Sequence, residues 1–214
     1  MASNSTDPGY IDKMKGAEMK PIEARKEKDM KYYLIVQSPV GDLTLVAYDG
    51  ALTGVYFAGR DPINAAKGWT RDARHPVLRE AAKQLREYFA GKRKSFALPL
   101  RLAGTDFQQR VWREIARIPY GQTVSYSALA ERAGAPRAVR AAGTSTGRNP
   151  AAIVVPCHRI MGKNGDLCGF GGGLERKVYL LKLENPDMSL DDEARKKTAP
   201  RKKRKERRLD AAVK

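Results

Sequence analysis

Runs of apolar, β-forming residues that turn signals interrupt predict a small sheet in the first third of the chain. Residues 31–57 are rich in β-branched, aromatic and leucine side chains, and turn signals interrupt them at residues 38–42 and at Asp49-Gly50. An Asp-Gly pair between such runs is typical of a tight hairpin. We therefore expect an antiparallel sheet whose strands lie around residues 33–35, 43–47 and 52–57.

Apolar residues spaced three or four apart predict a helix after this sheet. Residues 61–72 lack such a period, and we expect a loop there. Pro76 suits the first turn of a helix, and Gly91 is suited to end it. The apolar face of this helix consists of Leu78, Ala82, Leu85 and Phe89. An extended link over residues 96–102 follows, and we place a domain boundary near Leu100.

A pair of short helices around Gly134 is the most distinctive pattern of the second half. Ser125 can cap the first helix, and Pro136 can open the second. Two helices joined by a short turn that contains glycine form a helix-turn-helix signature. We expect these two helices to span residues 126–133 and 136–145.

Two further helices flank this pair. Thr105 can cap the earlier one, Pro119 ends it, and its apolar stripe consists of Phe107, Val111 and Ile115. The later one is expected over residues 174–184, before Pro186. The residues expected to point inward from it are Leu174, Val178, Leu181 and Leu180.

These elements predict an α+β fold with two domains and two tails. Residues 1–30 are polar and read as a flexible arm. Residues 31–100 form a small domain with an antiparallel sheet and a helix. Residues 101–186 form a helical, winged-helix-like domain with the helix-turn-helix. Residues 187–214 form a basic, flexible tail.

Charge narrows the choice of partners. The formal net charge is +17, from 41 Lys and Arg against 24 Asp and Glu, and residues 195–208 hold ten basic residues and one acid. Such a balance favours a polyanion, with nucleic acid ahead of an anionic membrane. Arg137 and Arg140 are expected on one face of the second helix, among small residues such as Gly143. Taken alone, such a pair of arginines is more often a solvated surface.

The chain has only two cysteines, Cys157 and Cys168. Two thiols do not make a disulfide framework, so we expect a reducing compartment. We find no apolar segment typical of a secretion signal or of a membrane-spanning helix. We therefore expect a soluble, intracellular protein that does not associate with membranes.

The most informative motif is Pro156-Cys157-His158-Arg159. A thiolate is a strong nucleophile, and a neighbouring base or cation makes it available at neutral pH. The alternative is a buried structural cysteine. Neighbouring residues of a strand point to opposite faces, so the thiol and the imidazole can cooperate only if Pro156 holds them in a bend. The glycine-rich segment after the motif lacks the Gly-Lys-Ser/Thr ending of a phosphate-binding loop.

The order of these motifs resembles the O6-alkylguanine-DNA alkyltransferases, also called methylated-DNA–protein-cysteine methyltransferases. The resemblance covers about residues 32–184 and is strongest from Phe107 onward. The residues that carry it are Ile118-Pro119-Tyr120-Gly121, Tyr126, Arg140, Asn149-Pro150, Pro156-Cys157-His158-Arg159 and Gly172-Gly173-Leu174.

The resemblance implies DNA repair by a single, irreversible displacement. Cys157 would take the alkyl group from O6-alkylguanine, and also from O4-alkylthymine, and would keep it as a thioether, so that each molecule acts once. His158 would take the thiol proton through a water, and Glu184 would orient the imidazole. Tyr126 would donate a proton to the departing base. We expect no cofactor and no metal.

The resemblance also implies how DNA is bound. Asn149, Phe170 and Gly172 would form the pocket for a base that is flipped out of the duplex. Arg140 would fill the vacated stack, with Arg137 and Gly143 beside it at the DNA. The substrate would be double-stranded DNA, entered through its minor groove by a monomer. The expected location is the cytoplasm, at the nucleoid, in a prokaryote and the nucleus in a eukaryote.

The chain departs from the family pattern in three places. Cys168 stands where a small or hydroxyl residue is expected. The first domain has no cysteine and only His75, so it cannot form the zinc site of some relatives. The basic segment at 195–208 has no counterpart in the family. The alternatives are a non-catalytic binder of alkylated or unspecific DNA, an architectural DNA-binding protein and a thiol hydrolase.

Overall fold

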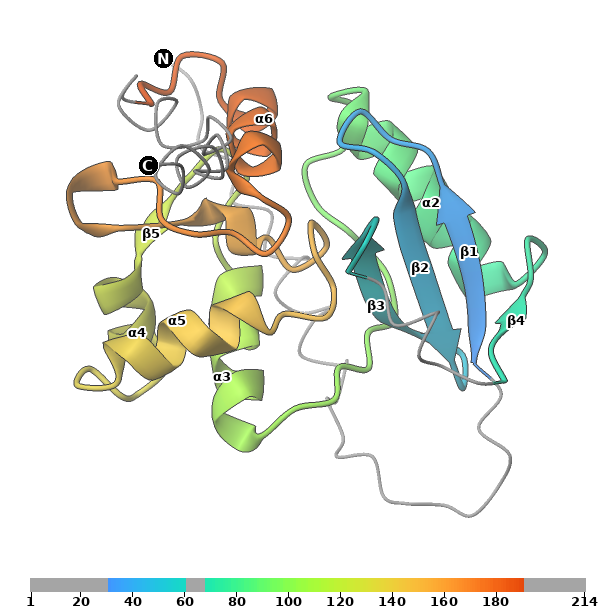
Figure 1. Ribbon diagram of the computed structural model, residues 1–214, viewed down its shortest axis with the longest axis horizontal. Helices are drawn as coiled ribbons and strands as arrows, with labels where there is room; N and C mark the ends of the chain where they lie inside the picture. The colour runs from blue at the N-terminus through green and yellow to red at the C-terminus, as the bar shows by residue number, and fades with distance from the viewer. Residues whose placement is uncertain (1–30, 61–67, 191–214) are drawn as a thin grey trace, which may run out of the picture.

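A computed structural model describes residues 31–60 and 68–190. The predicted N-terminal arm, part of the predicted loop at 61–72 and most of the basic tail lie outside these residues. Figure 1 shows the sheet and one helix on one side of the molecule and the remaining helices on the other. No helix in the described part of the chain combines the length and apolar character that crossing a membrane requires.

The predicted hairpins are confirmed. Strands β1 (Tyr32–Val36), β2 (Leu43–Tyr48) and β3 (Ala51–Phe57) pair antiparallel in this order. Asp49 and Gly50, which join β2 to β3, have φ values of 46° and 71°. A two-residue turn with two positive φ values matches the right-handed twist of the flanking strands.

The sheet has a fourth strand that the apolar pattern did not predict. β4 (Thr70–Arg71) pairs parallel with β1, so the sheet is mixed and its order is β3-β2-β1-β4. The expectation of a purely antiparallel sheet, and of a loop up to residue 72, was wrong here. Both residues of β4 are exposed. They therefore leave no apolar signal, and backbone pairing alone defines the strand.

Helix α2 (Pro76–Phe89) packs against β1, β2 and β3. Its predicted face is confirmed at Leu78, Ala82 and Leu85, which are buried. Near its end the helix buries Tyr88, whereas Phe89 is only half-buried. Tyr88 faces the second half of the chain and takes part in the site described below.

The second half is helical, as predicted. Its helices are α3 (Asp106–Ala116), α4 (Tyr126–Arg132), α5 (Val139–Gly147) and α6 (Leu174–Glu184). Thr105 caps α3 as expected. Its hydroxyl accepts the Gln108 backbone N–H, and the Gln108 side chain accepts the Thr105 N–H in return, which is a capping box. Val111 and Ile115 are buried as expected, together with Trp112.

The helix-turn-helix pair differs from the prediction in its turn. α4 ends at Arg132 and α5 begins at Val139, so six residues separate the helices and Pro136 does not open the second one. Backbone hydrogen bonds from Ala135 to Ala130 and from Ala138 to Ala135 fill this turn. Arg137 therefore lies in the turn rather than on the helix that carries Arg140.

Helix α6 turns a different face inward from the one that its apolar residues predicted. Leu180 and Leu181 are buried, but so are Lys177 and Glu184, whereas Leu174 and Val178 are only half-buried. The two buried charged side chains reach polar partners around the Cys157 segment, which compensates their removal from water.

The segment before Cys157 is buried but does not form a regular strand. Residues 151–161 are all buried. Ile153 has a φ of 71°, which is strained for a β-branched residue. The chain then forms a 3-10 turn, η1 (Cys157–Arg159), and a short strand, β6 (Ile160–Met161), which pairs parallel with β5 (Val124–Ser125). A second 3-10 turn, η2 (Lys163–Gly165), follows.

Strand β3 holds this segment in place. The Val55 N–H donates to the Pro150 carbonyl at 2.8 Å, and the Ala152 N–H donates to the Val55 carbonyl at 3.0 Å. Leu52 is bonded in the same way to the link near Leu100. The free edge of the first sheet thus supports the turn that presents Cys157.

Candidate active site

Cys157 lies at a cavity of about 280 Å³ between the two halves of the molecule. It begins the turn η1, and Pro156 precedes it with a φ of −80°. The turn provides the bend that cooperation between Cys157 and His158 requires. The cysteine side chain is buried, with 7% of its surface exposed. The cavity supplies the opening through which a small group can reach the sulfur.

His158 is completely buried and lies beside Glu184. Its Nε2 is 2.8 Å from Oε1 of the glutamate, while its Nδ1 is buried and has no hydrogen-bond partner among the described residues. Burial lowers the pKa of His158, and the hydrogen bond and charge of Glu184 oppose this only in part. The imidazole is therefore neutral at pH 7. With Nε2–H donated to the carboxylate, Nδ1 carries the free lone pair.

The Glu184 carboxylate accepts five hydrogen bonds. Tyr88 Oη donates to it at 2.7 Å, His158 Nε2 and two nitrogens of Arg159 at 2.8 Å each, and the Gly121 N–H at 3.1 Å. Burial alone would raise the pKa of this carboxyl. The hydrogen bonds from His158 and Arg159 nevertheless hold its pKa far below the ordinary value. Glu184 is therefore a fixed, ionised acceptor that orients the imidazole ring.

Arg159 completes this buried network, which residue types alone did not reveal. Its third guanidinium nitrogen donates to the Ile118 carbonyl at 2.5 Å, and its Cζ lies 5.8 Å from the ring centre of Tyr120. The Tyr120 hydroxyl donates in turn to the Leu183 carbonyl. The only sequence signal for a role of Arg159 in the site was its place in the motif Pro156-Cys157-His158-Arg159. Tyr88, far away in the chain, gave none.

Asn149 and Lys177 set the environment of the thiol. The Asn149 side chain donates to the Val155 carbonyl and accepts the Ala151 N–H, so it fixes the strained segment before Cys157. Burial raises the pKa of the Cys157 thiol, whereas a hydrogen bond from Asn149 and the charge of Lys177 act to lower it. The resting sulfur is therefore protonated, and a base is needed to release the thiolate.

Lys177 itself was missed by the sequence analysis. Its Nζ donates to the Ile160 carbonyl at 2.5 Å and to the Cys168 carbonyl at 3.3 Å. Burial lowers its pKa to about 8. The lysine ties α6 to the backbone before and within the glycine-rich segment, residues 162–173, and adds a positive charge near both thiols.

Aromatic rings from both halves form one wall of the cavity. Phe170 meets Phe57 edge to face, with ring centres 5.7 Å apart. A β-carbon at Gly172 would lie 2.6 Å from the Phe57 ring and 2.9 Å from the Phe170 ring. Gly172 is therefore required by close packing. The structure thus brings Asn149, Phe170 and Gly172 to the same cavity as Cys157.

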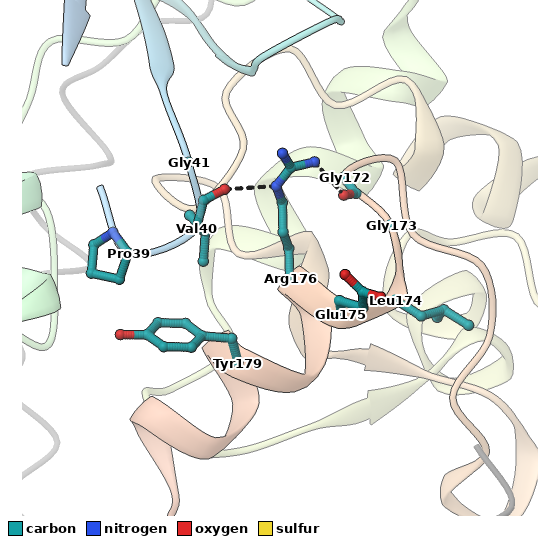
Figure 2. Close-up of a pocket in the computed structure, with 9 residues that line it drawn as sticks. All are labelled: Pro39, Val40, Gly41, Gly172, Gly173, Leu174, Glu175, Arg176 and Tyr179. Atoms are coloured by element: carbon teal, nitrogen blue, oxygen red, sulfur yellow. Dashed lines mark hydrogen bonds between the residues drawn. The ribbon is translucent and has the colours of Figure 1, made fainter. Parts of the chain in front are cut away.

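Arg176 anchors this wall to the first sheet. Its Nε donates to the Val40 carbonyl at 2.7 Å, and its Nη1 donates to the Gly172 carbonyl at 2.8 Å. Figure 2 shows both bonds, at a second cavity of about 690 Å³ between the turn before β2 and the start of α6. The guanidinium also lies 5.2 Å from the ring centre of Phe57.

The remaining predicted residues lie outside the cavity lining. Tyr126 begins α4 and is half-buried, and burial raises its pKa to about 12. A β-carbon at Gly143 would lie 3.6 Å from its ring, so the start of α4 lies close to the middle of α5. Arg140, on α5, and Arg137, in the preceding turn, are both exposed. These two arginines do not line the cavity. They lie on the same helix-turn-helix unit as Tyr126.

Cys168 is half-buried and packs against Gly162, where a β-carbon would lie 2.6 Å from its Sγ. Cys168 is not among the residues that line the Cys157 cavity. No group of three or more His, Cys, Asp or Glu residues suited to a metal ion occurs within residues 31–60 and 68–190.

Comparison with known proteins places both halves in one family. Residues 31–102 match the ribonuclease-like domain of 6-O-methylguanine DNA methyltransferase, and residues 106–186 match its DNA binding domain. A methylated-DNA–protein-cysteine methyltransferase of Mycolicibacterium paratuberculosis is 48% identical over 152 residues, which are 71% of this chain and 91% of that protein. The constitutive enzyme of Bacillus subtilis is 43% identical over 159 residues, which are 72% of this chain and 96% of that protein.

Solved structures give the same result. The crystal structure of Mycobacterium tuberculosis O6-methylguanine methyltransferase superposes with a TM-score of 0.68 at 44% identity, covering 76% of this chain and 97% of that one. The same bacterium's protein in complex with DNA gives a TM-score of 0.66 at 44% identity, covering 72% of this chain and 93% of that one.

Proposed function

Because this chain belongs to the methylated-DNA–protein-cysteine methyltransferase family, and so reverses O6-methylguanine damage in DNA directly, we propose that Cys157 is the residue that accepts the alkyl group. The observation that carries this assignment is the buried thiol of Cys157 at a cavity, next in sequence to a buried, neutral histidine held by Glu184.

The first step of the reaction makes the thiolate. The Cys157 proton passes through a water to Nδ1 of His158, the ring nitrogen that has no protein partner within the described structure. The imidazolium that results is stabilised by the Glu184 carboxylate at 2.8 Å. Because burial raises the pKa of Cys157 and lowers that of His158, the charged pair forms only transiently and close to the reaction.

The second step transfers the alkyl group. The sulfur attacks the alkyl carbon, a C–S bond forms, and the bond from carbon to O6 of guanine breaks. The electron pair of that bond goes to the guanine, and Tyr126 donates a proton to the ring nitrogen. The proton held by His158 then restores the Tyr126 hydroxyl through solvent, so the net proton transfer is from the Cys157 thiol to the guanine. Burial raises the pKa of Tyr126 to about 12, so its hydroxyl is protonated and able to donate. The product is a thioether, and no residue is assigned to remove it, so each molecule reacts once.

DNA is bound by the pair α4 and α5 in this proposal. A base inside a duplex is out of reach of a buried sulfur, so the alkylated nucleotide must be flipped out, which costs a few kcal/mol. Arg140 is exposed on α5 and would fill the space left in the stack, with Arg137 on the neighbouring phosphates and Gly143 allowing close approach. We assign this contact to the minor groove and the active species to a monomer. The substrate is double-stranded DNA that contains O6-alkylguanine, and the proposed location is the cytoplasm, at the nucleoid, since these two relatives are bacterial.

Mass spectrometry tests the acceptor assignment. After incubation with a duplex that contains O6-methylguanine, the intact protein should gain the mass of one CH₂ group, located on the peptide of Cys157. Cys157→Ala should show no gain and should still bind DNA, whereas Cys168→Ala, the matched thiol control, should react like the wild type. An adduct on Cys168, or none in the wild type, would contradict the assignment. O4-methylthymine in the same duplex context tests the second proposed substrate.

A further inference from the structure

The rim of the Cys157 cavity carries two arginines that the proposed chemistry does not use. Arg60 follows β3 in the first half of the chain, and Arg148 follows α5 in the second half. Both side chains are exposed. Among the described residues that line the cavity, they are the only charged ones, and none is acidic.

Gly171, in the cavity wall, lies beside Arg60 and beside the residue that precedes Arg148. A β-carbon at Gly171 would lie 3.4 Å from Nη1 of Arg60, so the guanidinium rests against this part of the cavity wall. The same β-carbon would lie 3.9 Å from the carbonyl oxygen of Gly147, the residue directly before Arg148. Within the described residues, neither guanidinium forms an ion pair with a carboxylate.

This arrangement gives the cavity two zones with different chemistry. The interior consists mainly of apolar and aromatic groups around the thiol, such as Val55, Phe57 and Phe170, which suit the flat face of a neutral base. The rim offers two fixed positive charges with planar donor groups, which suit the oxygens of a phosphate. A nucleotide has the same two parts in the same order, a base attached through its sugar to an anionic backbone.

We propose that Arg60 and Arg148 bind the phosphate next to the extruded nucleotide, one from each half of the chain. The inference rests on the proposed function, because it needs a flipped nucleotide in the Cys157 cavity. It adds a direct DNA contact from the sheet-bearing half, outside the helix-turn-helix. Bound DNA then bridges the two halves across the cavity mouth, and the phosphate helps to hold the base in its reactive position.

The experiment compares duplex DNA with a substrate that has no phosphate. Arg60→Gln, Arg148→Gln and the double variant are tested on a duplex with one O6-methylguanine and on free O6-benzylguanine. Each single variant should flatten the slope of log affinity against log salt by about one unit, which corresponds to about an eightfold weaker binding at 0.1 M salt. The rate with free O6-benzylguanine should be unchanged in all three. Arg60→Lys should keep the wild-type slope, because a lysine retains the charge at the phosphate.

Arg79→Gln is the matched control, since Arg79 is exposed on α2, loses the same charge and does not line the cavity. Its slope should equal that of the wild type. The inference is overturned if the wild type repairs the duplex while Arg60→Gln and Arg148→Gln keep the wild-type slope. It is also overturned if Arg60→Gln slows the free base as much as the duplex, since the side chain would then only support Gly171. Failure of the proposed function is distinct, because the wild type would then form no Cys157 adduct with either substrate.

Discussion

Replacing Glu184 by glutamine tests the buried network on which the proposed mechanism depends. The carboxylate accepts five hydrogen bonds and is the partner of the buried Arg159. Glutamine keeps the shape but removes the charge, and its NH₂ group would face donors. Loss of one partner of a buried ion pair costs about 3–5 kcal/mol. We therefore expect Glu184→Gln to lower the free energy of unfolding by that amount, measured by urea denaturation.

The same change should slow the chemistry. Without the carboxylate, Nε2 of His158 no longer has an acceptor that fixes its tautomer, and the imidazolium loses its counter-charge. General-base assistance contributes about 10²–10⁴-fold to such reactions, so the rate with free O6-benzylguanine should fall by at least about 100-fold. The control is Glu114→Gln, because Glu114 forms a 2.5 Å pair with a half-exposed Arg117. Such surface pairs contribute about 0.2–1 kcal/mol, and the control should keep its rate.

The pH dependence of stability is a third measurement on the Glu184→Gln variant. The pKa of His158 is lowered from 6.5 and that of Glu184 from 4.5. Each group therefore binds a proton more readily in the unfolded chain than in the folded protein. The wild type loses folding stability as the pH falls below the ordinary pKa of each group. Glu184→Gln lacks the second group and should lose less stability below pH 4.5. The reasoning is refuted if this variant unfolds within about 1 kcal/mol of the wild type and reacts at a similar rate.

Three further changes probe separate parts of the site. Gly172→Ala should slow alkyl transfer by about tenfold or more, because a β-carbon there would lie 2.6 Å from an aromatic ring and overpacking costs about 1–3 kcal/mol; Gly169→Ala, with no atom within 4 Å, should react normally, and equal rates would reject the close-packing argument. Arg140→Ala should impair repair of duplex DNA more than reaction with free O6-benzylguanine, and equal losses would exclude a role in flipping. Deleting residues 195–214 should flatten the salt dependence of DNA binding by about one unit per lost phosphate contact without changing the free-base rate, and identical slopes would show that this segment does not contact DNA.

The sequence predicted those turns and helix ends whose conformation depends on only a few neighbouring residues. Asp49-Gly50 predicted a hairpin because its conformation is favoured within two residues, and Thr105 predicted a helix start because its cap spans three. The predicted start of the helix after Pro136 was wrong by three residues, because α5 begins at Val139. There the backbone hydrogen bonds of residues 130–138, rather than the proline, decide where α5 begins.

Long-range contacts explain what the sequence could not predict. The hydrogen bond from Tyr88 to Glu184 joins residues 96 positions apart. Lys177 is charged and yet buried, because its ammonium group donates hydrogen bonds to two backbone carbonyls. Ile153 adopts a conformation that its side chain disfavours, and hydrogen bonds from Asn149, from β3 and within residues 151–155 surround it. None of these features leaves a periodic or compositional trace.

The positions of these exceptions show how the fold presents its nucleophile. The strain at Ile153 lies between two anchors, the β3 edge before it and the buried pair of Arg159 and Glu184 after it. A segment held at both ends cannot relax into the extended form that its apolar residues favour, so the turn that follows keeps the thiol beside the cavity. The sheet therefore acts on the chemistry through the backbone, although Cys157 and the helices that are proposed to bind DNA all belong to the other half.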